Sequence, residues 1–185
     1  MFGWIILGVV VLAVLYAVVL YNGLVKSRQL VEEGWSGIDV QLKRRSDLIP
    51  NLLETVKGYM GHERETLEAV TNARAAATSA AAGSPAQRAQ AEGQLSQALG
   101  RLIATAEAYP DLKASTNFLE FQSSLQAIED EIQMARRYYN GAVRNLNVMV
   151  ESVPSNLIAG PFGFQKAEYF ELENPADRAV PTVKF

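Results

Sequence analysis

The sequence contains no cysteine and only one histidine, His62, among its 185 residues. The absence of cysteine excludes disulfides and thiolate metal sites, and a lone histidine excludes the H-E-x-x-H zinc motif, which needs two. The formal net charge is −3, so no overall positive charge favours binding to nucleic acid. Strand-like runs are scarce beyond the N-terminus, whereas helix-forming residues are plentiful. The composition therefore predicts an all-α protein, and we expect it to bind no metal, cofactor or nucleic acid.

The long apolar run at the N-terminus has the properties of a membrane span. No Lys, Arg, Asp, Glu or His precedes Lys26, and the core from Trp4 to Tyr21 is about long enough to cross ~30 Å of hydrocarbon. Trp4 and Tyr21 stand where interfacial aromatic residues are expected. A cleaved signal peptide is the alternative, but no Lys or Arg precedes the run and no clear Ala-x-Ala site follows it. We therefore predict a transmembrane anchor over residues 1–25, with the lipid bilayer as its partner.

The charges beside this span predict its orientation. The N-terminal flank carries no Lys or Arg, whereas Lys26 and Arg28 follow the span closely. Positive charges near a span favour the cytoplasmic side. We therefore expect a single-pass protein of the cell membrane with its remaining residues in the cytoplasm.

The rest of the chain reads as helices separated by capping residues. An apolar seam with alternating spacings of three and four predicts a helix over residues 116–151. Ser84, Pro85 and Gln87 form a capping box with proline at the first helical position, which predicts a helix over 85–109. The seam of the longer helix consists of Phe118, Phe121, Leu125, Ile128, Ile132, Ala135, Tyr139, Ala142, Leu146 and Met149.

The stretch from Lys43 to Pro50 carries signals for the end of one helix and the start of another. Three cations at residues 43–45 suit a helix C-terminus, while Ser46 or Asp47 can cap the next helix and Pro50 then falls in its first turn. We therefore predict helices over 26–46 and 48–82. The alternative is one continuous, kinked helix, because the apolar phase does not change, and Arg45 would then lie in the apolar seam.

The sequence resembles the LemA family of bacterial membrane proteins along nearly its whole length. The resemblance lies in "YNGLVKSRQLVEEGWSGIDVQLKRRSDLIPNLLETVKGYMGHERETLEAVTNAR", "FLEFQSSLQAIEDEIQMARRYYNGAVRNLN" and "PSNLIAGPFGF", in that order. It implies an N-terminal transmembrane helix followed by an antiparallel four-helix bundle, here residues 26–153. It implies no catalytic residue.

The segment around His62 offers one alternative function. "HERETL" is loosely similar to the phosphoacceptor helix of histidine-kinase dimerisation bundles. The proline typical of that helix is missing, and no ATP-binding domain follows. A signalling or phosphotransfer module using His62 is the alternative function, and a hydrolase with an unrecognised site is a third option. Catalysis normally needs a convergent set of titratable groups, and we find none in the sequence.

The irregular tail over residues 154–185 is rich in aromatic residues. Phe162, Phe164, Tyr169 and Phe170 lie among loop-forming Pro and Gly. These side chains either pack onto the parent bundle or form a docking element for another subunit or an unidentified protein partner. We expect a homo-oligomer held by the bundle and the tail, and a non-enzymatic scaffold or assembly module as its function.

Overall fold

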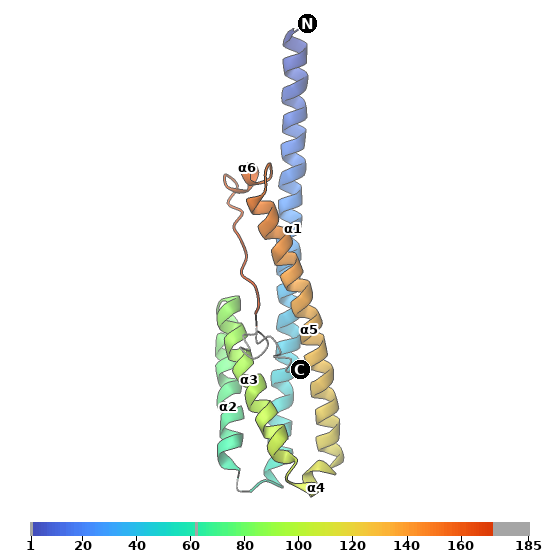
Figure 1. Ribbon diagram of the computed structural model, residues 1–185, viewed down its shortest axis with the longest axis vertical. Helices are drawn as coiled ribbons and strands as arrows, with labels where there is room; N and C mark the ends of the chain where they lie inside the picture. Colours follow the sequence, from blue (N-terminus) through green and yellow to red (C-terminus); the bar gives the residue numbers. More distant parts are fainter. Residues whose placement is uncertain (1, 62, 172–185) are drawn as a thin grey trace, which may run out of the picture. The chain divides into compact units, whose positions relative to one another are not determined.

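The computed structural model describes residues 2–61 and 63–171, and these residues form helices and loops without a strand. Figure 1 shows the helices in chain order. The predicted all-α class is confirmed. The elements are α1 (Phe2–Lys57), α2 (Arg64–Ser79), the 3-10 helix η1 (Ala80–Ala82), α3 (Pro85–Ala106), α4 (Pro110–Lys113), α5 (Thr116–Glu151) and α6 (Asn156–Ala159).

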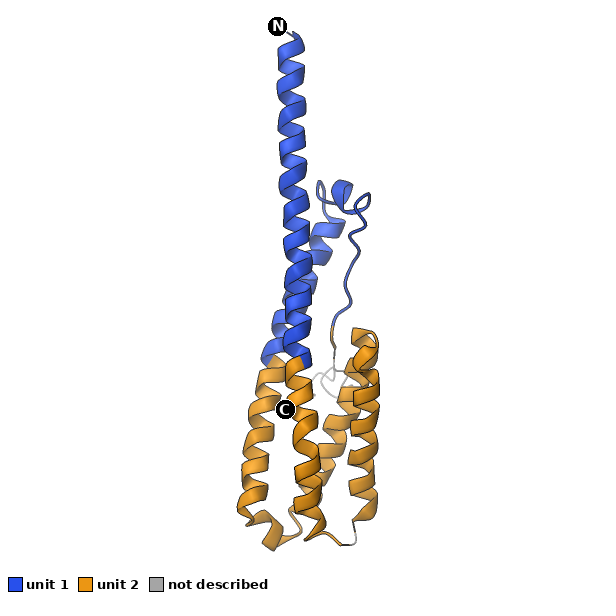
Figure 2. Cartoon of the chain, turned by 180° about the vertical axis from the view of Figure 1, so that it is seen from behind, with its two compact units in different colours: residues 1–39, 134–169 blue, residues 40–133, 170–185 orange. Residues whose placement is uncertain are grey.

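The chain forms two compact units, coloured separately in Figure 2. The first unit comprises residues 1–39 and 134–169, and the second comprises residues 40–133 and 170–185. Helices α1 and α5 each contribute residues to both units. The anchor stretch and the tail up to residue 169 therefore belong to the first unit.

The second unit is a bundle of helical segments from α1, α2, α3 and α5, closed at one end by the short α4. Short connections between consecutive helices make neighbours antiparallel, and Figure 1 shows the segments alternating in direction. At the start of α3, the backbone N–H of Gln87 donates to the Ser84 hydroxyl and the Ser84 N–H donates to the Gln87 side chain. The predicted capping box is therefore confirmed.

Apolar side chains from every helix of the bundle fill its core. The seam predicted on α5 is confirmed, because all of its residues except Ala135 and Met149 are buried. Burial of such side chains contributes about 1.5–3 kcal/mol each. The core of the second unit consists of Ile49, Leu52, Val56, Met60, Leu67, Val70, Ala77, Leu95, Ala98, Leu99, Leu102, Ala106, Leu112, Phe118, Phe121 and Leu125.

The predicted helix break between residues 46 and 48 is wrong. Helix α1 continues through Pro50 to Lys57, and the chain turns at Gly58–Glu63 before α2 begins at Arg64. Proline inside a helix leaves the carbonyl four residues earlier without its usual donor. Here that carbonyl belongs to Ser46, and it accepts a hydrogen bond of 3.0 Å from Arg74 Nε on α2. The tertiary contact replaces the missing backbone donor and allows the helix to continue.

The first unit pairs α1 with the C-terminal part of α5. Gly34 permits this pairing, because a Cβ atom at this position would lie only 3.0 Å from the Tyr139 Cα atom. The Trp35 ring lies next to Tyr139, with 5.4 Å between ring centroids. Near the end of α5, Leu24 on α1 packs with Leu146, with Ala159 of α6 and with Phe164 of the tail. The tail therefore completes a small apolar cluster between the two helices.

Candidate functional site

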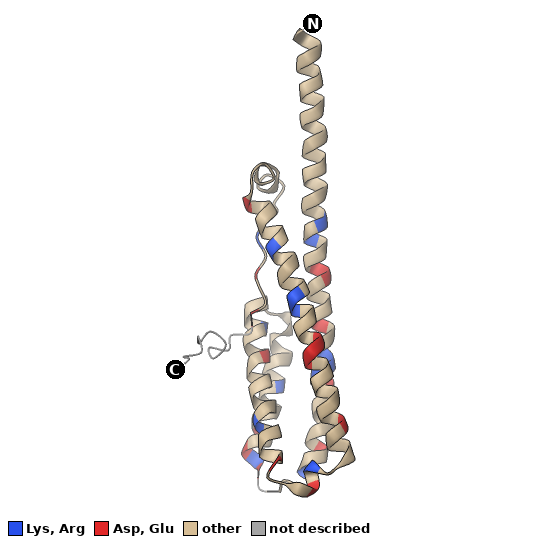
Figure 3. Cartoon of the chain, turned by 45° about the vertical axis from the view of Figure 1, so that its right-hand side comes forward, with Lys and Arg blue, Asp and Glu red and all other residues tan. Residues whose placement is uncertain are grey.

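The N-terminal part of α1 is apolar and exposed. Trp4 and most apolar side chains up to Tyr21 are open to solvent, and Figure 3 shows no Lys, Arg, Asp or Glu on this part of the helix. Among the described residues, α1 is the helix that is long and apolar enough to cross a membrane. A run of exposed apolar residues on this scale is typical of a surface that contacts a membrane or another protein.

The four aromatic residues of the tail fall into two classes. Phe164 and Phe170 are buried within the protein itself, whereas Phe162 and Tyr169 are exposed. The Tyr21 ring lies edge-on to Phe162 and Phe164, at centroid distances of 5.1 and 5.7 Å. Of the candidate interaction residues, only Phe162 and Tyr169 are therefore available to a partner without rearrangement.

Polar contacts hold the tail against α5. The side chain of Asn147 accepts a hydrogen bond from the Ala167 N–H at 2.8 Å and donates one to the Ala167 carbonyl at 3.0 Å. The Tyr139 hydroxyl donates to the Glu168 carbonyl at 2.8 Å. Burial raises the pKa of the Tyr139 phenol, and the charge of Glu168 raises it further, so the group remains a donor at neutral pH.

An ion-pair cluster lies inside the bundle of the second unit. The Arg45 guanidinium on α1 donates to Glu92 on α3 at 2.5 Å and to Glu129 on α5 at 2.6 Å. It also donates to the Ser96 hydroxyl at 2.8 Å. Arg45 and Glu92 are almost fully buried, whereas Glu129 keeps 30% of its side chain exposed. This cluster links three helices through charged hydrogen bonds.

The chemistry available to the cluster is limited. Arginine stays protonated, so Arg45 cannot act as a general base, and its carboxylate partners are already engaged by its guanidinium. In residues 2–61 and 63–171, no group of three His, Cys, Asp or Glu side chains could hold a metal ion. The cluster is therefore suited to fixing the register of the helices.

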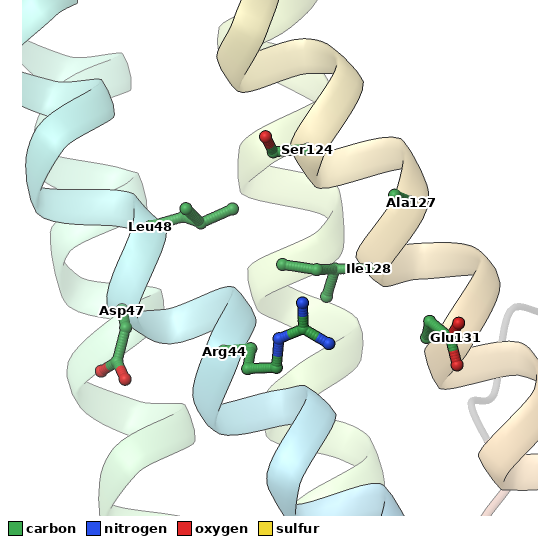
Figure 4. Close-up of a pocket in the computed structure, with 7 residues that line it drawn as sticks. All are labelled: Arg44, Asp47, Leu48, Ser124, Ala127, Ile128 and Glu131. Carbon is green, nitrogen blue, oxygen red and sulfur yellow. The ribbon is translucent and has the colours of Figure 1, made fainter.

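An open groove of about 490 Å³ lies on the surface of the second unit, between α1 and α5. Figure 4 shows Leu48 of α1 and Ile128 of α5 between the two helices, with the Arg44 guanidinium beside Ile128 and Glu131 farther along α5. Asp47, Ser124 and Ala127 complete the lining. An apolar floor with charges of both signs at the rim resembles the anatomy of protein interfaces.

The comparison with protein families identifies the chain. The model of the LemA family matches residues 34–185, which include the groove, the ion-pair cluster and the tail. The chain belongs to the LemA family. The matched residues begin after the exposed apolar part of α1, so the family match and the apolar stretch are separate observations.

Individual relatives support this assignment. Protein LemA of Metamycoplasma hominis is 26% identical over 150 residues, which is 81% of this chain and 68% of the relative. Magnetosome protein MamQ 2 of Paramagnetospirillum magneticum is 35% identical over 85 residues, which is 46% of this chain but only 31% of the relative. Magnetosome protein MamQ of Magnetospirillum gryphiswaldense is 32% identical over the same length. The match thus spans about a third of these MamQ relatives.

His62 lies outside the described residues, so the phosphotransfer alternative stays a prediction. Its neighbour Glu63 accepts a hydrogen bond of 3.2 Å from the Tyr109 hydroxyl. Partial removal from water raises the pKa of Tyr109, and the Glu63 carboxylate raises it further. Glu63 therefore has a structural partner in this LemA-family chain.

Sequence reasoning missed the partners of Arg45 and the groove. Arg45 was recognised as a possible member of the apolar seam, but Glu92 lies 47 positions away along the chain. One signal was present: Arg88 and Glu92 occur three or four positions apart in phase with Leu95, and all three are buried. When each of two helices carries a charged residue at the spacing of its apolar seam, the two residues can form a buried ion pair. The groove between α1 and α5 has no such signal, because it depends on how the helices pack.

Proposed function

We propose that the chain is a membrane-anchored, non-enzymatic scaffold or assembly module that associates with itself at the cytoplasmic face of a bacterial cell membrane. The observation that carries this proposal is the continuity of α1. One helix supplies both the exposed apolar stretch, starting at Phe2, and the core residues Ile49, Leu52 and Val56 of the bundle. The same helix thus contributes residues to the apolar stretch and to the bundle core.

A scaffold role is consistent with the positions of the charged groups in the bundle. Buried Arg45 and Glu92 pair with each other, and apolar side chains fill the core. Binding surfaces, in contrast, are open to solvent in the groove bordered by Arg44 and Glu131. The names of the MamQ relatives assign them to the magnetosome, and part of their sequence is similar to this chain.

The cytoplasmic orientation rests on Lys26 and Arg28, which follow the apolar stretch, and it is tested by thiol labelling. The chain has no cysteine, and Ser79 at the end of α2 is exposed. In intact cells, the Ser79→Cys variant should resist a membrane-impermeant thiol reagent and react after lysis. Labelling before lysis would place the bundle on the opposite side.

Self-association is proposed to use the groove between α1 and α5. In a two-fold symmetric contact, each residue of the patch meets a residue of the same patch in the other copy. Arg44 of each copy would then pair with Glu131 of the other copy, so that the ion pair forms twice, and the contact would cover Leu48 and Ile128. A tethered chain also meets its copies at high effective concentration, so a modest contact is sufficient.

A charge exchange tests this contact in native membranes. Arg44→Glu and Glu131→Arg should each weaken chemical crosslinking between copies, because each places like charges opposite one another. The double variant should restore crosslinking, since it exchanges the two partners. Arg137→Glu is the matched control, because Arg137 is exposed on α5 outside the groove. Equal crosslinking in all four variants would exclude the groove as the contact, and absence of crosslinks in the unmodified protein would exclude self-association.

A further inference from the structure

The loop between α5 and the extended tail presents an uncharged, apolar surface. Residues 152–165 contain no Lys, Arg, Asp, Glu or His. Val153, Leu157 and Phe162 are 77%, 68% and 62% exposed. These side chains share one short loop that also contains α6, and water is a poor environment for such a group.

This loop is fastened to α1 at the end of the apolar stretch. The Phe162 ring contacts Tyr21 at 5.1 Å between centroids, and Phe164 packs on Leu24 in the same small cluster. The Arg28 guanidinium lies 5.1 Å from the centroid of the Phe164 ring. The loop is therefore held beside residues 21–28 of α1 by contacts within the first unit.

The position of Tyr21 determines which layer of the membrane the loop would contact. If the apolar stretch spans a bilayer, Tyr21 lies at the boundary between hydrocarbon and headgroups. The headgroup region is about 5–7 Å thick on each side of the hydrocarbon core. Phe162 lies within that distance of Tyr21, so its ring falls in or next to this layer.

The charges around the loop agree with this location. Glu151 and Lys166 flank the uncharged segment and form an ion pair of 2.7 Å, and the hydrogen bond from Lys166 to Glu151 raises the pKa of the lysine. Lys26 and Arg28 are exposed one to two turns beyond Tyr21, where cationic side chains can reach headgroup phosphates. Charged residues thus border the apolar loop without interrupting it.

We infer that residues 153–162 form a second membrane contact, in which Val153, Leu157 and Phe162 insert into the interfacial layer of the same leaflet that receives Tyr21. The occupant of this surface is the lipid bilayer. The inference rests on the proposed membrane anchoring of α1. Its consequence is that the chain contacts the membrane at two points, the apolar stretch of α1 and the loop.

Spin labels on single cysteines test this inference in the full-length protein, because the chain has no cysteine of its own. Val153→Cys and Leu157→Cys report on the loop and leave the Phe162–Tyr21 contact intact. Val14→Cys reports on the apolar stretch. Met134→Cys is the matched control, because Met134 is an exposed apolar residue of the same unit about 22 Å along α5 from Met149.

Each labelled protein is placed in lipid nanodiscs with one chain per disc, and collisions with oxygen and with a water-soluble nickel complex are measured. The loop labels should collide with the nickel complex several-fold less than the Met134 label and retain access to oxygen. A lipid-exposed Val14 label together with nickel access at the loop equal to that at Met134 would overturn the inference and leave the anchor standing. Protection of the loop from both reagents would show a protein contact and also overturn it. A Val14 label open to nickel would overturn the anchor and this inference together.

Discussion

Arg45 on α1 and Glu92 on α3 form an ion pair inside the bundle, with 1% and 5% of their side chains exposed. Removing two charges from water costs several kcal/mol per ion, which their attraction and hydrogen bonds must offset. The contact of Arg45 with Glu129 and Ser96 adds two further acceptors. The pair specifies which turn of α1 lies opposite which turn of α3, because a shift of α3 would leave the buried Glu92 carboxylate without its cation.

Arg45→Ala should therefore destabilise the protein strongly. The substitution leaves the Glu92 carboxylate buried without its cation, and breaking a buried pair in this way typically costs about 3–5 kcal/mol. Thermal or urea unfolding followed by circular dichroism measures the loss. Arg45→Lys should also be destabilising, because an ammonium cannot reproduce the forked guanidinium geometry.

The double variant Arg45→Met with Glu92→Leu tests whether Arg45 stabilises the bundle mainly by neutralising the Glu92 carboxylate. Replacing both ions by apolar groups of similar size should recover most of the stability lost in Arg45→Ala. The matched control is Lys43→Ala, which removes an exposed cation paired with Asp47 at 3.3 Å and should change stability by less than about 1 kcal/mol. A double variant as unstable as Arg45→Ala would mean that Arg45 has a role beyond neutralising Glu92.

Pro50 and Arg74 should be energetically coupled. Arg74 Nε donates to the Ser46 carbonyl, which receives no backbone hydrogen bond because Pro50 has no N–H. Arg74→Met should cost about 1–2 kcal/mol in the natural background, because the carbonyl then loses its donor. In a Pro50→Ala background the helix supplies its own donor, so the same substitution should cost clearly less.

A double-mutant cycle measures this coupling from four unfolding curves. Arg64→Met provides the comparison, because Arg64 is an exposed arginine at the start of the same helix. Its effect should be small and independent of the residue at position 50. Equal costs for Arg74→Met in both backgrounds would show that the Arg74 contact does not compensate for the proline.

These two contacts explain where sequence reasoning succeeded and where it failed. Helix α5 was predictable because its signal is local, with apolar residues recurring every three or four positions. The end of α1 was misplaced because cations and a proline near residue 46 usually end a helix. Their partners, Glu92 and Arg74, come from other helices and are invisible in a local window. The true turn did carry a local signal in Gly58 and Gly61, which favour turns.

The tail shows a similar limit to what the sequence alone can predict. Its aromatic content was evident from the sequence, but the difference between buried Phe164 and exposed Phe162 was not. The two residues are separated only by Gly163, which adopts a φ of 71°, a conformation that few other residues adopt at low cost. Tyr21 contacts both rings, but only Phe164 joins the Leu24 cluster, and this cluster depends on the pairing of α1 with α5.

The seam of α5 gives a direct test of the core. Ile132→Asp places a carboxylate at a position that is 1% exposed and should cost several kcal/mol of a total near 5–15 kcal/mol. Met134→Asp, two residues away at an exposed position, should have little effect. Thermal melts of the two variants provide the comparison, and equal melting temperatures would contradict the assignment of the seam.

The last prediction concerns Asn147, whose side chain pairs with both the N–H and the carbonyl of Ala167. Leucine at this position has a similar volume but neither donor nor acceptor, so Asn147→Leu should release the extended tail from α5 while α5 stays folded. Hydrogen exchange should then increase in residues 165–169, with little change in α3 of the other unit. The neighbouring Asn145 is exposed, and Asn145→Leu is the matched control.

The same substitution separates two ways in which the loop 153–162 can be held. The loop is attached to α5 at one end and followed by the Asn147 contact at the other, while Phe162 and Phe164 bind it to Tyr21 between these points. If the aromatic contacts suffice, exchange in residues 156–160 should stay slow in Asn147→Leu even as residues 165–169 exchange faster. Faster exchange in both segments would show that the polar clamp and the aromatic contacts act as one cooperative unit. Unchanged exchange in residues 165–169 would contradict the assigned role of Asn147.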